Sequence, residues 1–144
     1  MKYILISLLF ISTSFTQSFT DPFDFLSESY GSDVVTNGTF ASDANWTKGA
    51  GWTISGGVAV GSNTSNALTQ TLSVTVGKFY LVTYTVVTIT GGSIRPNFGG
   101  ITNLTSRNAV GTYTEIILCP HAEIRFVGTG FSGTIDNVIV REVQ

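Results

Sequence analysis

The sequence has few of the residues through which many proteins form covalent or metal-dependent sites. Cys119 is the only cysteine and His121 the only histidine, so an internal disulfide and a zinc cluster of cysteines and histidines are both excluded. Stability must therefore come from packing. We interpret Cys119 as a small buried side chain beside a turn at Pro120, since unpaired cysteine is usually buried. The alternative is a covalent link to a second chain.

Charge is also scarce. Charged residues make up 11% of the 144 residues, and the net charge is −2. The seven lysines and arginines are scattered along the chain, which argues against the clustered basic footprint of a nucleic-acid-binding protein. No stretch after residue 30 repeats apolar residues every 3.6 positions, so amphipathic helices are not expected.

Catalytic motifs are missing as well. The sequence contains no G-x-S-x-G, no HExxH and no phosphate-binding loop. A glycosidase needs two carboxylates flanking one cleft, and no motif pairs any two acids of the expected domain. Cys119 and His121 lack an evident third group, and a turn at Pro120 explains them more simply. We therefore expect a protein that is not an enzyme.

What the sequence does contain is threonine, valine and isoleucine in short runs separated by glycine and asparagine, which is typical of strands and turns. The clearest run is 79–90. Alternation there places one set of side chains in the core: Tyr80, Val82, Tyr84 and Val86. It places the other set on a solvated face: Leu81, Thr83, Thr85, Val87 and Ile89.

The whole domain is predicted to contain about ten strands. Their expected ranges are 33–35, 51–55, 58–61, 66–75, 79–90, 93–98, 101–105, 112–118, 122–127 and 134–143. Pro96 cannot donate a ladder hydrogen bond, so its strand is expected at a sheet edge or at a bulge. This number of strands is typical of an all-β fold in which two antiparallel sheets pack face to face, as in a jelly-roll sandwich.

The N-terminal segment differs from the rest. One lysine precedes a short apolar run at 3–11 and a small polar tail, an arrangement typical of a secretory signal peptide. Cleavage is expected after Ser14, Gln17 or Ser18. The alternative is a retained apolar arm that packs on a neighbour. Nine residues are too few for a membrane span, which needs about 20. The predicted organisation is thus residues 1–18 as signal or arm, 19–32 as linker and 33–144 as the sandwich.

Five segments carry a family resemblance. They are VVTNGTF (34–40), NWTKGAGWTISGGVAV (45–60), GKFYLVTYTV (77–86), GTYTEI (111–116) and GTIDNVIVREV (133–143). In this order they resemble the jelly-roll carbohydrate-binding modules of the CBM4/CBM9-like type, within the galactose-binding-like folds. The resemblance implies a non-catalytic glycan-binding module. It is of the form found in phage structural proteins and in secreted bacterial glycan-active proteins.

The resemblance also raises the question of a structural calcium. The family often has two acids in its opening motif, but Thr39 and Ala41 occupy these positions here. Asp136 matches the family's C-terminal acid and is therefore a weak metal candidate without its partners. Calcium takes six to eight oxygen ligands, often carboxylates. We expect no cofactor and interpret Asp136 as bonded to nearby backbone.

Candidate ligand contacts are an exposed aromatic ring and polar side chains near it. Trp46 lies in a polar loop and is either a ligand platform or a lid over the end of the sandwich, whereas Trp52 is expected in the core. The predicted ligand-binding residues are Trp46, Arg95, Asn97, Phe98, Asn103 and Arg107.

Two functions from different classes follow. The first is a structural and adhesive module on a virion surface, such as a capsid decoration or tail appendage, anchored through residues 1–30 and assembled with other virion or cell-surface proteins. The second is a secreted bacterial glycan-binding protein with a cleaved signal peptide. Both place the chain on a virion surface or outside the cell, with a glycan as ligand and no nucleic acid as partner.

Overall fold

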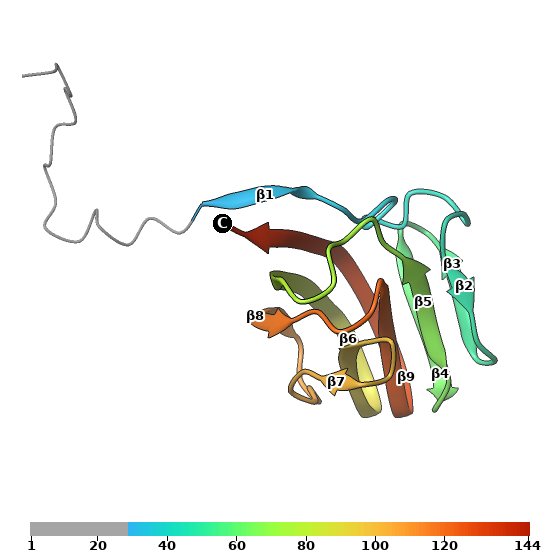
Figure 1. Ribbon diagram of the computed structural model, residues 1–144. Coiled ribbons are helices and arrows are strands. Elements are labelled where there is room, and N and C mark those ends of the chain that lie inside the picture. The colour runs from blue at the N-terminus through green and yellow to red at the C-terminus, as the bar shows by residue number, and fades with distance from the viewer. Residues whose placement is uncertain (1–28) are drawn as a thin grey trace, which may run out of the picture.

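Two long strands run through the whole molecule. In the computed structural model, which describes residues 29–144, β6 (Phe79–Phe98) and β9 (Glu123–Val143) pair in antiparallel orientation along their length and curve together through the fold (Figure 1). The other strands join them on either side: β1 (Tyr30–Asp33), β2 (Thr47–Lys48), β3 (Trp52–Ser55), β4 (Val58–Thr64), β5 (Ala67–Thr71), β7 (Thr102–Asn103) and β8 (Gly111–Leu118).

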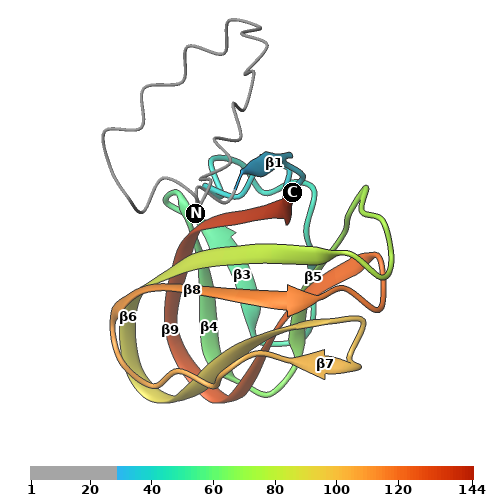
Figure 2. The ribbon, with the colours of Figure 1, turned by 60° about the vertical axis from the view of Figure 1, so that its left-hand side comes forward.

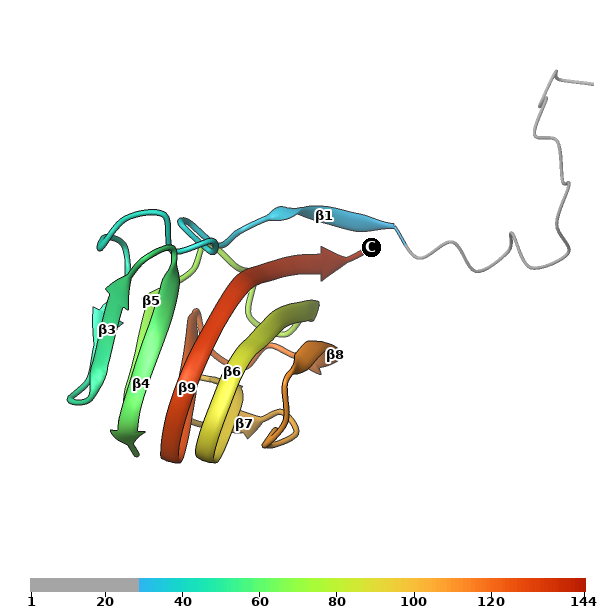
Figure 3. The same ribbon diagram turned by 180° about the vertical axis from the view of Figure 1, so that it is seen from behind.

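The curvature divides the sheet into two layers. In the first layer, β8 pairs with the beginning of β6, while β4 and β1 pair with the second half of β9, and β3 lies beyond β4. In the second layer, β7 pairs with the end of β6, while β5 pairs with the beginning of β9, and β2 lies beyond β5. Figures 2 and 3 show the layers from two further sides. The predicted all-β sandwich is confirmed, with nine strands and no helix in residues 29–144.

Glycines permit the bend between the layers. The pairing of β6 with β9 shifts register between Gly91 and Ser93, and Gly92 and Gly130 have φ of 68° and 59°. A Cβ on Gly92 would lie 2.3 Å from the carbonyl oxygen of Gly130. Only a residue without a side chain lets the two backbones approach this closely, since real Cβ contacts under 3.0 Å are essentially never seen.

The core lies between the layers and follows the predicted alternation. Tyr80, Val82, Tyr84 and Val86 are all buried. The predicted core position of Trp52 is also confirmed, because its ring stacks on Phe131 with centroids 5.6 Å apart. Fully burying an aliphatic or aromatic side chain contributes about 1.5–3 kcal/mol, so these strands are held mainly by their inward faces.

The alternation breaks at Val87, which the sequence did not predict. Val86 pairs with Ile135 and Thr88 pairs with Thr134, so Val87 is an extra residue in β6. Such a bulge inverts the inward and outward positions beyond it. The prediction that Ile89 faces solvent is therefore wrong: Ile89 is half-buried against the core.

The first strand also begins earlier than predicted. β1 starts at Tyr30, opposite Val143, within the segment expected to be a linker. At its end, Asp33 Oδ1 accepts hydrogen bonds from the amides of Val35 and Val140 at 3.0 Å each, which ties the chain to β9. The predicted signal peptide or arm at 1–18 and most of the linker lie outside the described residues. Among residues 29–144, no helix is long and apolar enough to cross a membrane.

Pro96 is not at a sheet edge. β6 pairs with β9 on one side of it, and on the other side the Pro96 carbonyl accepts a hydrogen bond from the Leu104 amide at 2.9 Å. The register on that side shifts by one residue, because Asn97 lies opposite Asn103 whereas Ile94 bridges to Arg107. The sequence allowed either a sheet edge or a bulge at Pro96, and the shift in register agrees with the second of these.

Candidate functional site

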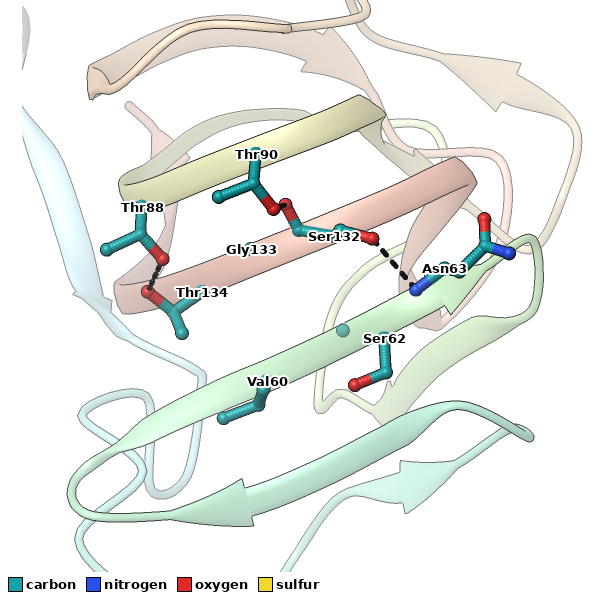
Figure 4. Close-up of a pocket in the computed structure, with 9 residues that line it drawn as sticks. Val60, Ser62, Asn63, Thr88, Thr90, Ser132, Gly133 and Thr134 are labelled. Atoms are coloured by element: carbon teal, nitrogen blue, oxygen red, sulfur yellow. Dashed lines mark hydrogen bonds between the residues drawn. The ribbon is translucent and has the colours of Figure 1, made fainter.

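An open groove crosses three strands on the outer face of the first layer, at the bend (Figure 4). Its volume is about 440 Å³, within the 300–1,000 Å³ typical of small-molecule sites. The residues that line it come from β4, β6 and β9: Val60, Gly61, Ser62, Asn63, Thr88, Thr90, Ser132, Gly133 and Thr134.

Two glycines form part of the groove. Gly61 on β4 lies directly opposite Gly133 on β9, and neither contributes a side chain to the space above them. A Cβ on Gly61 would lie 2.5 Å from the ring of Phe131, and a Cβ on Gly133 would lie 2.2 Å from the carbonyl oxygen of Thr88. The buried Trp52–Phe131 stack therefore supports the groove at Gly61.

Hydrogen bonds hold the groove's hydroxyl groups in place. The hydroxyls of Thr88 and Thr134 are 2.8 Å apart, and Ser132 Oγ accepts a hydrogen bond from the amide of Asn63 at 3.0 Å. Thr90 donates to the carbonyl of Ser132 at 3.3 Å. Figure 4 shows these side chains on neighbouring strands, pointing toward one another across β6, β9 and the end of β4.

Other polar groups in the groove remain available to a ligand. Within residues 29–144, neither Ser62 Oγ nor the side-chain amide of Asn63 makes a hydrogen bond. No charged residue lines the groove. Hydroxyl and amide groups can both donate and accept hydrogen bonds, so the groove suits an uncharged ligand rich in hydroxyl groups.

A smaller cavity of about 280 Å³ lies in the second layer beside β2 and β5. One of its lining residues is Gln70, whose side-chain amide already makes hydrogen bonds within the protein. The Gln70 amide nitrogen donates to the carbonyls of Thr36 and Asn45 at 2.8 and 3.2 Å, and its oxygen accepts from the Thr36 amide at 2.8 Å. This cavity is smaller than the groove and, unlike the groove, is lined by a charged residue, Glu123, so it suits an uncharged ligand less well.

Two of the predicted ligand-binding residues belong to the core. Trp46 is only 6% exposed, packs on Phe40 and Phe126 at centroid distances of 5.3 and 6.2 Å, and donates from Nε1 to the carbonyl of Asn37 at 3.1 Å. Phe98 is fully buried. The expectation that Trp46 is an exposed ligand platform is wrong, and so is the expectation that Phe98 faces a ligand, because burying an aromatic ring in the core stabilises the fold more than exposing it.

Three other predicted residues are brought together in the second layer. Asn97 lies opposite Asn103, and Arg95 is two positions before Asn97 on the same strand. Asn97 is nonetheless buried, and its Oδ1 accepts from the Gly100 amide at 2.9 Å, so its predicted ligand contact is corrected to a structural one. Among residues 29–144, the side chain of Arg95 makes no hydrogen bond or ion pair, and Asn103 is exposed. Their predicted ligand contacts stay a prediction.

Arg107 bridges to Ile94, the residue before Arg95, but its side chain is engaged within the fold. It forms an ion pair with Glu115 at 2.8 Å, and its guanidinium lies 4.5 Å from the ring centroid of Tyr113. Burial acts to raise the pKa of the Glu115 carboxyl, but hydrogen bonds from Thr105 and Arg107 outweigh it and hold the pKa below its usual range. The hydrogen bond to Glu115 raises the pKa of Arg107. This cluster fixes the loop before β8.

The remaining predictions concern Asp136 and Cys119. Asp136 Oδ1 accepts from the amide of Asn137 at 2.7 Å, which confirms the predicted bond to nearby backbone. In the described part of the chain, no group of three or more acids, histidines or cysteines could hold a metal ion. Cys119 is fully buried beside Pro120, as its first interpretation predicted, and its thiol donates to the carbonyl of His121 at 3.2 Å.

Sequence reasoning did not find the groove. Its hydroxyl-bearing residues come from segments 62–63, 88–90 and 132–134, which are far apart in the chain. The threonines of 79–90 indicated a solvated face. Thr88 and Thr90 lie on that face only because the bulge at Val87 inverts the alternation.

A comparison with solved structures found a similar fold in a bacteriophage protein. The structure is similar to the enzymatically active domain of tailspike protein 4 of bacteriophage CBA120, with a TM-score of 0.51 and 19% identity over 77% of this chain. The match spans 21% of the tailspike chain. It is also similar to a carbohydrate-binding module in a structure described as "CBM4 structure and function", with a TM-score of 0.48 and 18% identity, covering 75% of this chain and 99% of that one.

No protein-family model and no curated protein sequence matches the chain. The fold and the groove thus define an all-β sandwich of jelly-roll type that carries an uncharged polar groove on one outer face.

Proposed function

We propose that this protein is a non-catalytic glycan-binding module that acts as a structural and adhesive domain on a surface, and that the groove holds a neutral sugar unit. One observation carries the proposal: a groove of about 440 Å³ lined by hydroxyl and amide groups and by no charged residue. A sugar presents hydroxyl groups that both donate and accept, and these match the free Ser62 hydroxyl and Asn63 amide.

The same groove supports a role without catalysis. Hydrolysis of a glycosidic bond usually uses two carboxylates close to the bond. No carboxylate lines the groove, and the acids of the described chain are engaged elsewhere. Each has a partner in the fold: Asp33, Asp43, Glu115, Glu123, Asp136 and Glu142. The tailspike domain is described as enzymatically active, but that describes the tailspike domain and not this chain.

A virion surface is the setting that we propose, as a capsid decoration or a tail appendage. The sequence resembles a form of these modules found in phage structural proteins, and the same fold occurs in a bacteriophage tailspike. The second candidate is a secreted bacterial glycan-binding protein, which the signal-like residues 1–18 favour. The mass of the N-terminus separates the two, since a secreted protein begins between residues 15 and 19.

Glycan binding is tested by nuclear magnetic resonance titration with neutral oligosaccharides chosen from an array. We expect the amide signals of Ser62, Asn63 and Ser132 to shift on addition of the sugar. Ser62→Ala combined with Thr90→Ala removes two hydroxyl groups and is expected to weaken binding about tenfold or more, because each lost hydrogen bond is worth about 1 kcal/mol.

The matched control is Thr83→Ala combined with Thr114→Ala. This pair of threonine hydroxyls is 3.0 Å apart on the same outer face, away from the groove. Its loss is expected to leave binding unchanged. Binding to no glycan on the array would overturn the function. Shifts in the amide signals of Arg95 and Asn103, with no change at Ser62, would instead place the glycan-binding site in the second layer.

A further inference from the structure

An apolar patch occupies the end of the first layer where β6 begins. Phe79 and Leu118 lie directly opposite each other, facing outward, and are 54% and 47% exposed. The next outward pair is Leu81 and Ile116, and Ile116 is also 47% exposed. We call Phe79, Leu81, Ile116 and Leu118 the β6–β8 patch. Large side chains exposed this close together are uncommon on a soluble monomer and usually mark a contact surface.

The patch continues toward the point where the described chain begins. Tyr30 on β1 lies opposite Val143 on β9, one residue beyond the pair of Glu142 with Tyr80. Tyr30 is 38% exposed. Figure 1 shows the beginning of β1 and the end of β9 at the same end of the layer as the end of β8. The four strands β1, β9, β6 and β8 are therefore adjacent there.

One positive charge accompanies the patch. Arg141 lies between Asp33 of β1 and Leu81 of β6 in the register of the sheet, and it is exposed. Its side chain makes no hydrogen bond or ion pair with any residue that the structure describes. The surface thus combines apolar side chains with one guanidinium that makes no ion pair among the described residues.

The chain segment that leads into this surface has the complementary composition. Residues 21–28 read DPFDFLSE. The apolar side chains are Phe23, Phe25 and Leu26, and the acids are Asp21, Asp24 and Glu28. The segment joins the fold through Ser29, whose carbonyl accepts a hydrogen bond from the Gln144 amide at 2.9 Å.

The distances permit contact. From β1 to β8 is three strand spacings, or about 14 Å. Extended chain covers about 3.3 Å per residue, so about four residues span that distance. Counting back from Ser29, Leu26 is three residues away and reaches Phe79 on β6, and Phe25 is four residues away and reaches Leu118 on β8.

We propose that the occupant of the β6–β8 patch is the chain's own segment 21–28, with Phe25 and Leu26 on Phe79 and Leu118, and Asp24 or Glu28 near Arg141. The segment lies after every predicted cleavage point, so the proposal holds whether or not residues 1–18 are removed. A second copy is less favoured as the occupant. The tether keeps the segment at an effective concentration in the millimolar range, whereas a second copy must be supplied by the solution.

The test uses the whole chain and two kinds of measurement. The first looks for nuclear Overhauser contacts between the Phe25 ring and the methyl groups of Leu118. The second is a double-mutant cycle in thermal unfolding between Phe25→Ser and Leu118→Thr. We expect each single variant to lower the Tm by about 4 °C and the double variant to lower it little further, because both changes remove the same contact.

Ile101→Thr is the matched control. Ile101 is exposed and apolar but lies outside the patch, so its effect should add to that of Phe25→Ser without coupling. Additive effects of Phe25→Ser and Leu118→Thr, with no contact between the two side chains, would overturn the proposal. Contacts seen only between differently labelled molecules, with sedimentation that depends on concentration, would also overturn it and assign the patch to a second copy.

Discussion

Gly61 and Gly133 lie directly opposite each other on β4 and β9, one against the ring of Phe131 and the other against the backbone of Thr88. The pair belongs both to the core below it and to the groove above it. A side chain at either position would have to displace a core aromatic ring or separate β6 from β9. The shape of the groove therefore depends on the packing of the core through two residues that have no side chain.

Gly133→Ala is expected to destabilise the protein strongly. Its Cβ would lie 2.2 Å from the Thr88 carbonyl oxygen, and backbone cannot move aside as a flexible side chain can. We expect a loss of about 3 kcal/mol in the free energy of unfolding, measured in urea. Gly91→Ala, in the same bend, is the control, since its nearest neighbour would be 4.0 Å away. Equal effects of the two substitutions would contradict this account of the bend.

Trp46→Ala is expected to lower the stability of the fold, and any loss of ligand binding should follow from that. The ring is buried between Phe40 and Phe126, and truncating a buried tryptophan costs about 3–5 kcal/mol. Urea unfolding measures the loss, and exposed Val110→Ala serves as the control. Full stability of Trp46→Ala together with lost glycan binding would restore Trp46 as a ligand contact.

Glu115 is expected to make stability depend on pH in the acid range. Its carboxyl has a pKa in the folded state below the usual value, because hydrogen bonds from Thr105 and Arg107 outweigh the opposite effect of burial. A lowered pKa means that the charged form stabilises the fold. This contribution is complete above the unfolded-state pKa of about 4.3 and is lost as the pH falls through the lower folded-state value.

The measurement is the free energy of unfolding of wild type and Glu115→Gln between pH 2 and pH 7. Glu115→Gln should be less stable than wild type at neutral pH, and the difference should shrink toward acid. A constant difference across this range would show that Glu115 acts through packing alone. Asp43→Asn, which removes an exposed ion pair with Lys48, is the control and should have little effect.

Cys119 is expected to react slowly with thiol reagents in the folded protein. The side chain is fully buried, and burial raises the pKa of its thiol, so little thiolate is present and little of it is accessible. A thiol-reactive dye should label the native chain at least about tenfold more slowly than the chain in guanidinium chloride. Rapid native labelling, or a covalent dimer on non-reducing gels, would favour the link to a second chain.

Much of the fold was predictable because the signals involved are local. The alternation of Tyr80, Val82, Tyr84 and Val86 marks an inward face over a few neighbouring residues, and glycine-bearing turns mark where strands end. Cys119 beside Pro120 and the backbone bond of Asp136 also follow from residues one or two positions away.

The candidate site was not predictable in the same way. The groove needs Ser62, Thr88 and Ser132 to meet, and nothing in the separate segments specifies that β4, β6 and β9 are neighbours. The ring of Trp46 illustrates the same limit, since a polar sequence around it indicated exposure. Its burial depends on Phe126, which is 80 positions away along the chain.

The sequence by itself determined that this chain forms a sandwich of antiparallel strands with a tyrosine- and valine-rich core, because strand periodicity and turn chemistry act between near neighbours. Only the tertiary structure decided which polar residues share a surface and which aromatic rings are covered. The bulge at Val87 is the clearest case. One extra residue turns Thr88 outward to the groove and Ile89 inward to the core, and such a bulge shows itself only when β6 is paired with β9.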